Sequence, residues 1–309
     1  MSMSHKNSYE LSFLEILTTS VARMGKIPDH IAIIMDGNRR YARRKGLEVS
    51  NGHKAGADTL LNLYRWGNAL GCKELTVYAF SSENYKRSKQ EVDYLMELME
   101  QRCTQLLQAI ESHHESDTCI QMIGNLDNLP EKLRHRVAHL MQRTRLNKPY
   151  RLNVAVAYTS REGILAGLKA LIDKDQDKND PSELNEYIIH QSHSLMDLRP
   201  VDMLIRTGGD QRLSDFMLWE ASQAYIYTFY AGFMAGIQFW RTDACDFYVV
   251  PFEINEGENG GRILENLREE RWALVEQLAK DDLPIKKIEK FTKAEEKKFL
   301  KVAQTLMTF

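Results

Sequence analysis

Three stretches of this chain gather residue types that bind phosphate groups. The first, residues 36–40, reads Asp-Gly-Asn-Arg-Arg. Arginine presents a planar fork of N–H groups that matches phosphate oxygens, and Gly37 would let a phosphate approach the backbone closely. Asp36 would repel a bare diphosphate unless a divalent cation such as Mg²⁺ bridges the two. The residue types equally allow a plainer interpretation, in which Asp36 caps a helix and both arginines are solvated.

Two further stretches are polar in a similar way. Residues 81–87 place hydroxyls, an amide and a guanidinium in one segment, which by itself is typical of an ordinary polar loop. Residues 206–214 hold Arg206 and Arg212 around a Gly-Gly turn that Ser214 follows, and a capped surface turn is the alternative there. The first and third stretches together would make two anion sites, which indicates two phosphorylated substrates.

The elements that must position these stretches alternate along the chain. Continuous apolar runs predict strands at residues 30–35, 75–80, 119–123, 152–158 and 203–205. Helical periodicity predicts helices at residues 53–70, 129–146 and 162–172, and a longer helix that starts at the capping-box pattern of Ser88 and Glu91. This alternation predicts the α/β class, with a mostly parallel sheet and helices on both faces. Ligands of such sheets bind beyond the carboxyl ends of the strands, where Asp36, Ser81 and Arg206 are expected.

The two ends of the chain differ from this pattern. Residues 9–24 predict an amphipathic helix that either packs on its own domain or lies on a membrane or along a lipid channel. Its apolar face would hold Tyr9, Phe13, Ile16, Leu17, Val21 and Met24. Beyond about residue 236 the signal weakens, and residues 256–309 are charge-rich. We expect a partly helical tail there, indicated by Leu264, Leu267, Trp272, Val275 and Leu278.

Composition excludes several classes of protein. With a net charge of −2 and 43% hydrophobic residues, the chain is typical of a globular protein and gives no general reason to bind nucleic acid. A soluble phosphoprotein- or nucleic-acid-binding module that uses residues 39–45 is an alternative from another class.

The sequence contains no P-loop, no GxGxxG, no DDxxD and no HExxH pattern. Its four cysteines are far apart, as expected of reduced thiols, and neither a signal peptide nor a transmembrane run is predicted.

The motifs also resemble a known family. Residues 30–42 are similar to the first signature of the cis-prenyltransferases, the undecaprenyl diphosphate synthase family, and the double arginine resembles the catalytic subunit of eukaryotic dehydrodolichyl diphosphate synthases. The family's later motifs follow in order at Gly52-His53 with Gly56, at residues 78–84, at residues 205–209 and at residues 212–216. The resemblance spans roughly residues 9–225.

This resemblance implies an architecture and an activity. The fold would be a six-stranded parallel sheet with flanking helices and an apolar tunnel, followed by a helical C-terminal tail. Residues 1–27 would form the N-terminal amphipathic helix, residues 28–235 the catalytic domain and residues 236–309 a divergent tail. The enzyme would condense isopentenyl diphosphate onto farnesyl diphosphate to make long polyprenyl diphosphates for dolichol and protein glycosylation. It would act at the cytoplasmic face of the endoplasmic reticulum membrane, as a peripheral protein that does not bind nucleic acid.

The resemblance also implies a role for each motif residue. Asp36 would hold Mg²⁺, the implied cofactor, and Asp36 and Asn84 would serve catalysis. Because a neutral amide is a poor base, we expect Asn84 to orient groups rather than to take a proton. The allylic diphosphate would contact Asp36, Gly37, Asn38, Arg39, Arg40, His53, Ser81 and Arg87. Isopentenyl diphosphate would contact Arg40, Arg87, Arg206, Arg212 and Ser214.

Three departures from the family pattern imply a partner. Val49 replaces a loop arginine of bacterial members, and Tyr225 replaces an acidic metal ligand of bacterial homodimers. No Arg-x-Gly follows Ser214, whereas homodimeric members place that motif in the neighbouring subunit's site. We therefore expect an accessory subunit that resembles the Nogo-B receptor. The alternative is that this chain is itself a non-catalytic subunit of the same fold.

The sequence does not determine the length of the product, because that length would depend on packing around residues such as Leu95, Met99 and Leu106.

Overall fold

The computed structural model describes residues 11–112, 118–174 and 198–229, together with positions 269, 272, 273, 275–277 and 279. The helices are α1 (Phe13–Ala22), α2 (Asn38–Arg44), α3 (Val49–Leu70), α4 (Lys89–Ser112), α5 (Glu131–Thr144) and α6 (Ser160–Lys174), with short 3₁₀ turns at η1 (Ser82–Lys86) and η2 (Leu126–Asn128). The strands are β1 (His30–Ile34), β2 (Glu74–Ser81), β3 (Thr118–Ile123), β4 (Tyr150–Tyr158), β5 (Met203–Thr207) and β6 (Tyr225–Phe229).

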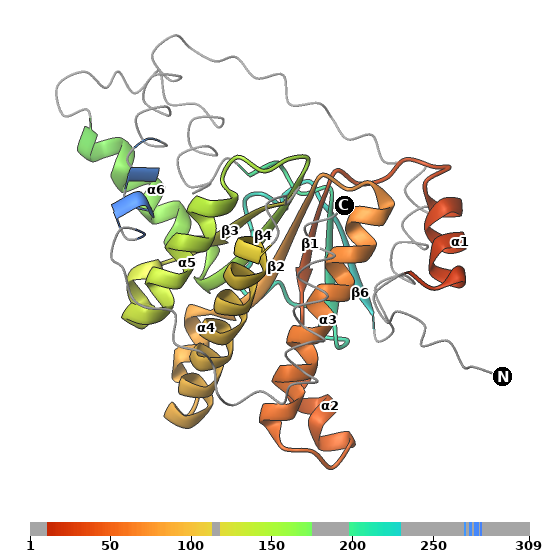
Figure 1. Ribbon diagram of the computed structural model, residues 1–309, viewed down its shortest axis with the longest axis horizontal. Helices are drawn as coiled ribbons and strands as arrows, with labels where there is room; N and C mark the ends of the chain where they lie inside the picture. The colour runs from red at the N-terminus through yellow and green to blue at the C-terminus, as the bar shows by residue number, and fades with distance from the viewer. Residues whose placement is uncertain are drawn as a thin grey trace, which may run out of the picture.

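The strands form one six-stranded sheet in the order β3-β4-β2-β1-β5-β6, and every neighbouring pair is parallel (Figure 1). The predicted α/β class and parallel sheet are therefore confirmed, and all the strands that the apolar runs predicted are present. The apolar runs alone did not predict β6, which is short, lies at the edge of the sheet and leaves Ile226 45% exposed. Arg206, expected just beyond the fifth strand, lies within β5.

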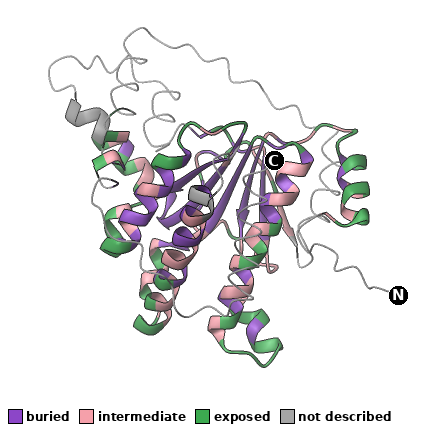
Figure 2. Cartoon of the chain, in the orientation of Figure 1, coloured by how far each residue is buried: buried purple, intermediate pink, exposed green. Residues whose placement is uncertain are grey.

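Helices α3, α4 and α5 pack on one face of the sheet. Their inward side chains join those of the strands in one buried cluster that includes Leu63, Met96, Cys103 and Val137. Figure 2 shows the division, with buried residues on the strands and on the inner sides of these helices. A second cluster covers the opposite face, where Phe216 and Met217 pack against strand residues such as Leu204.

An apolar cavity of about 170 Å³ lies between α3, α4 and the sheet. Asn38 and His53 line one end of it, and the start of β3 lines the other. The walls include the α4 residues Leu95, Met99 and Leu106, which were expected to govern product length. An apolar cavity is therefore present where the resemblance implied an apolar tunnel.

Helix α1 packs on α3 through its small and polar side. Thr19 and Ala22 are buried, and the Trp66 Nε1–H of α3 donates to Glu15 Oε1 at 2.7 Å. The apolar face is exposed instead, and α1 is accordingly coloured mostly green, for exposed residues, in Figure 2. The exposed side chains are Phe13, Leu14, Ile16, Leu17, Val21 and Met24. The helix therefore packs on its own domain, as one of the two interpretations expected, but it does so through its polar side rather than its apolar face. The described lining of the cavity includes no α1 residue.

The C-terminal tail contributes to the domain core at its described positions. Val275 and Ala279 are buried in the same cluster as the helices that cover the sheet. Arg145, at the end of α5, stacks over the Trp272 ring at 4.2 Å and pairs with Glu276 at 3.1 Å. The helix expected in this region is present at these positions.

Two expectations about covalent and membrane structure can be checked in the described part of the chain. Cys72, Cys103 and Cys119 are buried free thiols, as expected of reduced cysteines, whereas Cys245 lies outside the described residues. Within the same part of the chain, no helix combines the length and the apolar composition that crossing a membrane requires.

Candidate functional site

The site lies where the strand order of the sheet reverses. From β1 the chain first builds β2, on one side, and returns later to place β5 on the other side of β1. In open parallel sheets, ligands bind in the crevice at such a switch point, beyond the carboxyl ends of the strands. Asp36 follows β1 here, and Arg206 pairs in register with Ile34. The first and third polar stretches therefore meet in one network, although the sequence suggested two separate sites.

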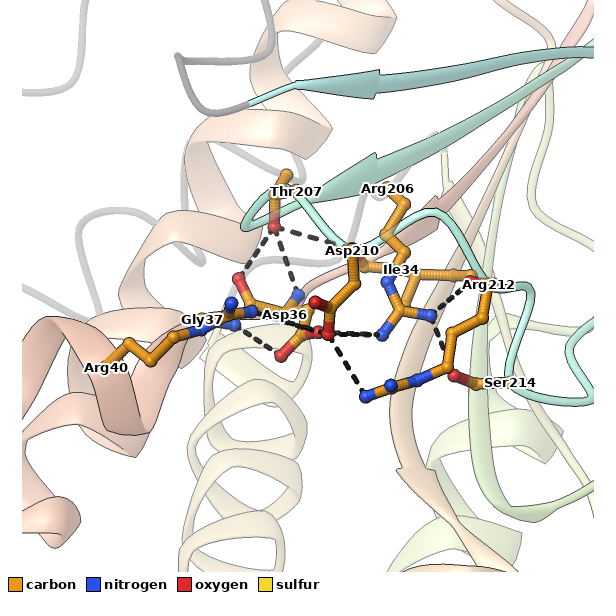
Figure 3. A network of polar contacts seen from close by, with 9 residues as sticks. All are labelled: Ile34, Asp36, Gly37, Arg40, Arg206, Thr207, Asp210, Arg212 and Ser214. Carbon is orange, nitrogen blue, oxygen red and sulfur yellow. Dashed lines mark hydrogen bonds and ion pairs between the residues drawn. The ribbon is translucent and has the colours of Figure 1, made fainter.

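Arg206 is the centre of this network, shown in Figure 3. Its Nη2 donates to Asp36 Oδ2 at 2.7 Å, and its Nη1 donates to Ser214 Oγ at 2.7 Å and to the carbonyl oxygen of Arg212. The side chain is only 4% exposed. A buried charge is costly unless it is paired and hydrogen-bonded, so these contacts fix both the fork and the residues around it.

A second carboxylate, Asp210, connects the remaining arginines to the network. Its Oδ2 lies 3.6 Å from Arg40 Nη2, 3.4 Å from Arg206 Nη2 and 3.1 Å from Arg212 Nη2. Arg40 also lies 3.4 Å from Asp36. Asp210 is not among the site residues predicted from the sequence, although it follows Gly209 directly inside the third polar stretch. The capping roles expected in the plain interpretations are wrong, because Asp36 and Ser214 bind Arg206 instead of capping helices. Arg39 and Arg40 are exposed, as the plain interpretation of the first stretch expected, although Arg40 also reaches both carboxylates.

The electrostatics of Asp36 follow from these contacts. Burial by itself raises the pKa of the Asp36 carboxyl, but hydrogen bonds from Arg206 and from the Gly37 N–H outweigh it, and the pKa lies below its ordinary value. Asp36 is therefore ionised at neutral pH. The described residues contain no cluster of three or more acidic, histidine or cysteine side chains that would enclose a metal ion. Two carboxylates that share an arginine do fit Mg²⁺, because this ion is often held by one or two carboxylates together with substrate phosphates.

Backbone contacts hold the two loops together. Thr207 Oγ1 donates to the Asp36 carbonyl oxygen at 2.9 Å and accepts from the Asp36 N–H at 3.0 Å. Gly208 has φ +87°, and a Cβ atom there would lie 3.0 Å from Arg40 Nη2 and 3.0 Å from the Asp36 carbonyl. Glycine is therefore needed both for the left-handed backbone and for the close approach.

The loop that carries Ser214 is held in a strained conformation. Ser214 and Asp215 have φ of 53° and 58°, values that L side chains rarely adopt. Arg161 Nε anchors the loop through Asp215 Oδ2 at 2.7 Å. Phe216 stacks on Tyr78 with ring centroids 4.5 Å apart. These contacts outside the network compensate for the strain and keep Ser214 beside the central arginine.

A second cluster lies at the mouth of the cavity. Glu91 Oε1 accepts from Arg87 Nη1 at 2.9 Å and lies 3.1 Å from His53 Nε2. Burial lowers the pKa of His53, Glu91 opposes this, and the positive charges of Arg87 and Arg39 add to the lowering. His53 is therefore neutral near pH 7. From the sequence, Glu91 is expected only in a capping box. Its backbone N–H does donate to Ser88 Oγ at 3.3 Å, but its carboxylate serves this cluster.

Asn38 sits between α2 and α3 because two glycines leave room for it. A Cβ atom on Gly56 would lie 2.5 Å from Asn38 Nδ2, and one on Gly52 would lie 2.3 Å from the Asn38 carbonyl oxygen. Both glycines belong to the family motif, and their role here is spatial. They let the Asn38 amide line the cavity.

The other predicted site residues make local contacts. Ser81 Oγ accepts the Glu83 N–H at 3.2 Å, and Asn84 Oδ1 accepts the Ser81 N–H at 3.2 Å, so both stabilise the η1 turn. Arg39 is exposed and acts on His53 through its charge. The structure therefore joins Asp36, Gly37, Arg40, Arg206, Arg212 and Ser214 in one network. Arg87 and His53 form the second cluster together with Glu91. Ser81 caps the η1 turn and Asn84 lies within it, and this turn directly precedes Arg87 in the sequence.

The chain is similar to known proteins. Residues 34–235 match the model of a prenyltransferase family described as "Putative undecaprenyl diphosphate synthase". The human dehydrodolichyl diphosphate synthase complex subunit DHDDS is 39% identical over 247 residues, covering 77% of this chain and 74% of its own. A tritrans,polycis-undecaprenyl-diphosphate synthase (geranylgeranyl-diphosphate specific) from Archaeoglobus fulgidus is 40% identical over 208 residues, covering 66% of this chain and 82% of its own.

A solved structure is similar as well. Lavandulyl diphosphate synthase from Lavandula x intermedia, in complex with dimethylallyl diphosphate, superimposes with a TM-score of 0.64 at 30% identity. The match covers 71% of this chain and 96% of that one. The family model spans well over half of the sequence and includes both loops of the network. The chain therefore belongs to the undecaprenyl diphosphate synthase family, the cis-prenyltransferases.

Proposed function

We propose that this chain adds isopentenyl diphosphate units to farnesyl diphosphate and makes a long polyprenyl diphosphate of the dehydrodolichyl type, used for dolichol and protein glycosylation. The observation that supports this proposal is an arginine network that lies beside an apolar cavity. Met35 and Asn38 line the cavity, and Asp36, which lies between them in the sequence, belongs to the network. An anion site that opens onto an apolar cavity suits a substrate with a diphosphate head and a hydrocarbon tail. Residues 28–235 would be the catalytic part of the chain.

The reaction assigns work to both clusters. The isopentenyl C4 carbon bonds to the allylic C1 as the C1–O bond breaks, and a proton then leaves the isopentenyl C2. Negative charge grows on the departing diphosphate, and preorganised arginines stabilise it most at that moment. On the allylic side the contacts would come from Asp36, Gly37, Asn38, Arg39, Arg40, His53, Ser81 and Arg87. On the isopentenyl side they would come from Arg40, Arg87, Arg206, Arg212 and Ser214.

Substrate pairing, Asn84 and the two carboxylates would each contribute to the reaction in a different way. Holding two diphosphates side by side turns a bimolecular attack into a positioned one. Asn84 would orient water or diphosphate, because its amide has no basicity at neutral pH. Asp36 and Asp210 would hold Mg²⁺ together with diphosphate oxygens, and the ion when bound would neutralise charge on the leaving group.

We further propose that full activity needs an accessory subunit resembling the Nogo-B receptor. Tyr225 stands where bacterial homodimers carry an acidic residue, and no Arg-x-Gly follows Ser214. The human relative is named a subunit of a dehydrodolichyl diphosphate synthase complex, which supports the same proposal.

The test is a product assay with farnesyl diphosphate, isopentenyl diphosphate and Mg²⁺, using the chain alone and then with the accessory subunit. We expect long cis-polyprenyl diphosphates in the mixture, lost in Asp36→Ala and kept in Asp93→Ala, which removes an exposed carboxylate of α4. Product from the chain alone at the same rate would overturn the need for a partner. No product in either reaction, from folded protein, would instead support a non-catalytic subunit.

We also propose that α1 binds the cytoplasmic face of the endoplasmic reticulum membrane peripherally. Its apolar face is exposed while its polar side packs on α3, which is the orientation a bilayer surface requires. In a flotation assay with phosphatidylcholine–phosphatidylserine vesicles, Phe13→Glu with Leu17→Glu should abolish binding and leave the melting temperature unchanged. Equal flotation of the variant and the original chain would overturn the proposal.

A further inference from the structure

An ion pair joins the two helices that form the walls of the apolar cavity. Arg102 of α4 donates through Nη2 to Asp58 Oδ1 of α3 at 2.7 Å. The Arg102 side chain is 15% exposed and that of Asp58 is 56% exposed, so the contact lies on the solvent side of the wall. Arg102 lines the cavity, and among its described lining residues it is the one with a permanent charge.

The pair lies about halfway along the cavity. Leu95, Arg102 and Ile110 line it in succession from α4. At 1.5 Å per helical residue, Arg102 lies roughly 10 Å beyond Leu95 and roughly 12 Å before Ile110. The mouth is marked by Asn38 and His53, and the lining beyond Arg102 is mostly apolar. A hydrocarbon chain that grows inward from the mouth therefore meets this pair before it reaches the far end.

The pair explains how a guanidinium can stand in an apolar wall. Arginine buries its aliphatic stem along apolar surface and keeps its head toward water. A largely buried charge is costly when its partner is removed, because it is left uncompensated. Asp58 holds the head on the outer side of the seam between α3 and α4, and the stem of Arg102 then closes the wall from within. Nearer the mouth, Tyr94 on α4 donates to the Ser50 carbonyl oxygen of α3 at 3.2 Å and His53 contacts Glu91, so the seam is bridged there as well.

We propose that the Asp58–Arg102 pair determines how far a prenyl chain extends inside the cavity before the wall opens. This inference rests on the proposed function, because the growing prenyl chain is the occupant. Chains that end before Arg102 are enclosed by an intact wall. Longer chains press on the Arg102 stem, and further extension requires the pair to separate. Arg102 and Asp58 are therefore specificity-determining residues that do not touch the reacting atoms.

The direct test measures binding of unreactive prenyl thio-diphosphates of increasing length to the full chain. In the original protein, affinity should rise with each isoprene unit and then level off at the length that reaches Arg102. Arg102→Met keeps the stem and removes the charge, and the longest analogue should then bind at least tenfold tighter than to the original protein. Asp58→Asn should shift the same break point, whereas Asp58→Glu, which keeps the negative charge opposite Arg102, should leave it in place. Arg134→Met is the matched control, because Arg134 pairs with Asp127 outside the cavity lining.

The elongation assay supplies a second measurement. Arg102→Met and Asp58→Asn should move the product distribution to longer chains, while the rate of the first condensation stays within twofold. A merely structural role would change the melting temperature and leave the length profile as it was. Unchanged length profiles in both variants, or no break point in the original protein, would overturn the inference. A break point at Arg102 in a protein that never elongates would overturn the proposed function alone.

Discussion

At the scale of single residues, Arg206 is the side chain on which the site depends. It binds Asp36, Ser214 and the Arg212 carbonyl at once and is almost completely buried. Lysine carries the charge but lacks the fork that makes these contacts together. Arg212 differs, because its side chain is 72% exposed and reaches the network from outside.

Arg206→Lys should therefore lower kcat/KM for isopentenyl diphosphate by about 10²-fold, the effect of losing a preorganised donor to a growing negative charge. Arg212→Lys should cost roughly tenfold, as expected for one weakened hydrogen bond to a charged group. Steady-state kinetics of both variants checks whether kcat/KM falls further in Arg206→Lys than in Arg212→Lys. Equal losses would contradict the central position of Arg206.

His53 gives a pH-dependent prediction at the same scale. Burial lowers the pKa of His53 in the folded protein. As the pH falls, the unfolded chain therefore binds a proton at this side chain before the folded protein does. Stability linked to this group is therefore complete above the unfolded pKa of about 6.5 and is lost as the pH falls below it. His53→Gln should reduce the fall in melting temperature between pH 7.5 and pH 5.5. The same slope in both proteins would show that His53 does not titrate in this way.

At the scale of elements, two glycines of α3 lie against Asn38 at the start of α2. A Cβ atom on Gly52 would lie 2.3 Å from a backbone oxygen, which can move only if α2 moves. A Cβ atom on Gly56 would meet the end of the Asn38 side chain instead, and that amide can turn away. A substitution at Gly52 therefore tests how α2 packs on α3, whereas one at Gly56 tests the placement of the Asn38 amide.

Gly52→Ala should lower the free energy of unfolding by about 1–3 kcal/mol, the cost of overpacking. Gly56→Ala should leave stability nearly unchanged, because better helix propensity of about 1 kcal/mol offsets the displaced amide. Its KM for the allylic substrate should rise, since Asn38 would leave the mouth of the cavity. Chemical denaturation measures the free energy of unfolding of each variant, and steady-state kinetics measures KM for the allylic substrate. A Gly56→Ala protein with normal KM would show that Asn38 is not needed there.

At the scale of the whole molecule, the charge-rich tail contributes to the core of the catalytic part. Val275 is 3% exposed and packs in the cluster beneath the sheet, and Trp272 stacks with Arg145 of the α5 end. Val275→Ala should lower the free energy of unfolding by about 2 kcal/mol through the cavity it leaves. The exposed Glu269→Ala is the control and should change it by less than about 0.5 kcal/mol. Equal denaturation midpoints for the two variants would mean that the tail does not stabilise the domain.

The sequence by itself determined the alternation of strands and helices and the positions of the polar stretches after or at the ends of strands. It could do so because hydrophobic periodicity and strand ends are local properties that a few neighbouring residues express. Asp36, Arg206, Arg212 and Ser214 were predicted site residues for this reason. The exposed apolar face of α1 and strand β6, which the apolar runs did not indicate, mark the limit, because burial of one face depends on what packs against it.

The tertiary structure alone decided which of these stretches meet. Asp36 and Arg206 are 170 residues apart and touch only because the chain places β5 beside β1. Asp210 and Glu91 became part of the site in the same way, since a carboxylate's role depends on which cations the fold brings within hydrogen-bond distance. The Asp58–Arg102 pair likewise exists only because α3 and α4 lie across one cavity. Strand order and helix packing follow from the burial of the whole chain, and no local pattern encodes them.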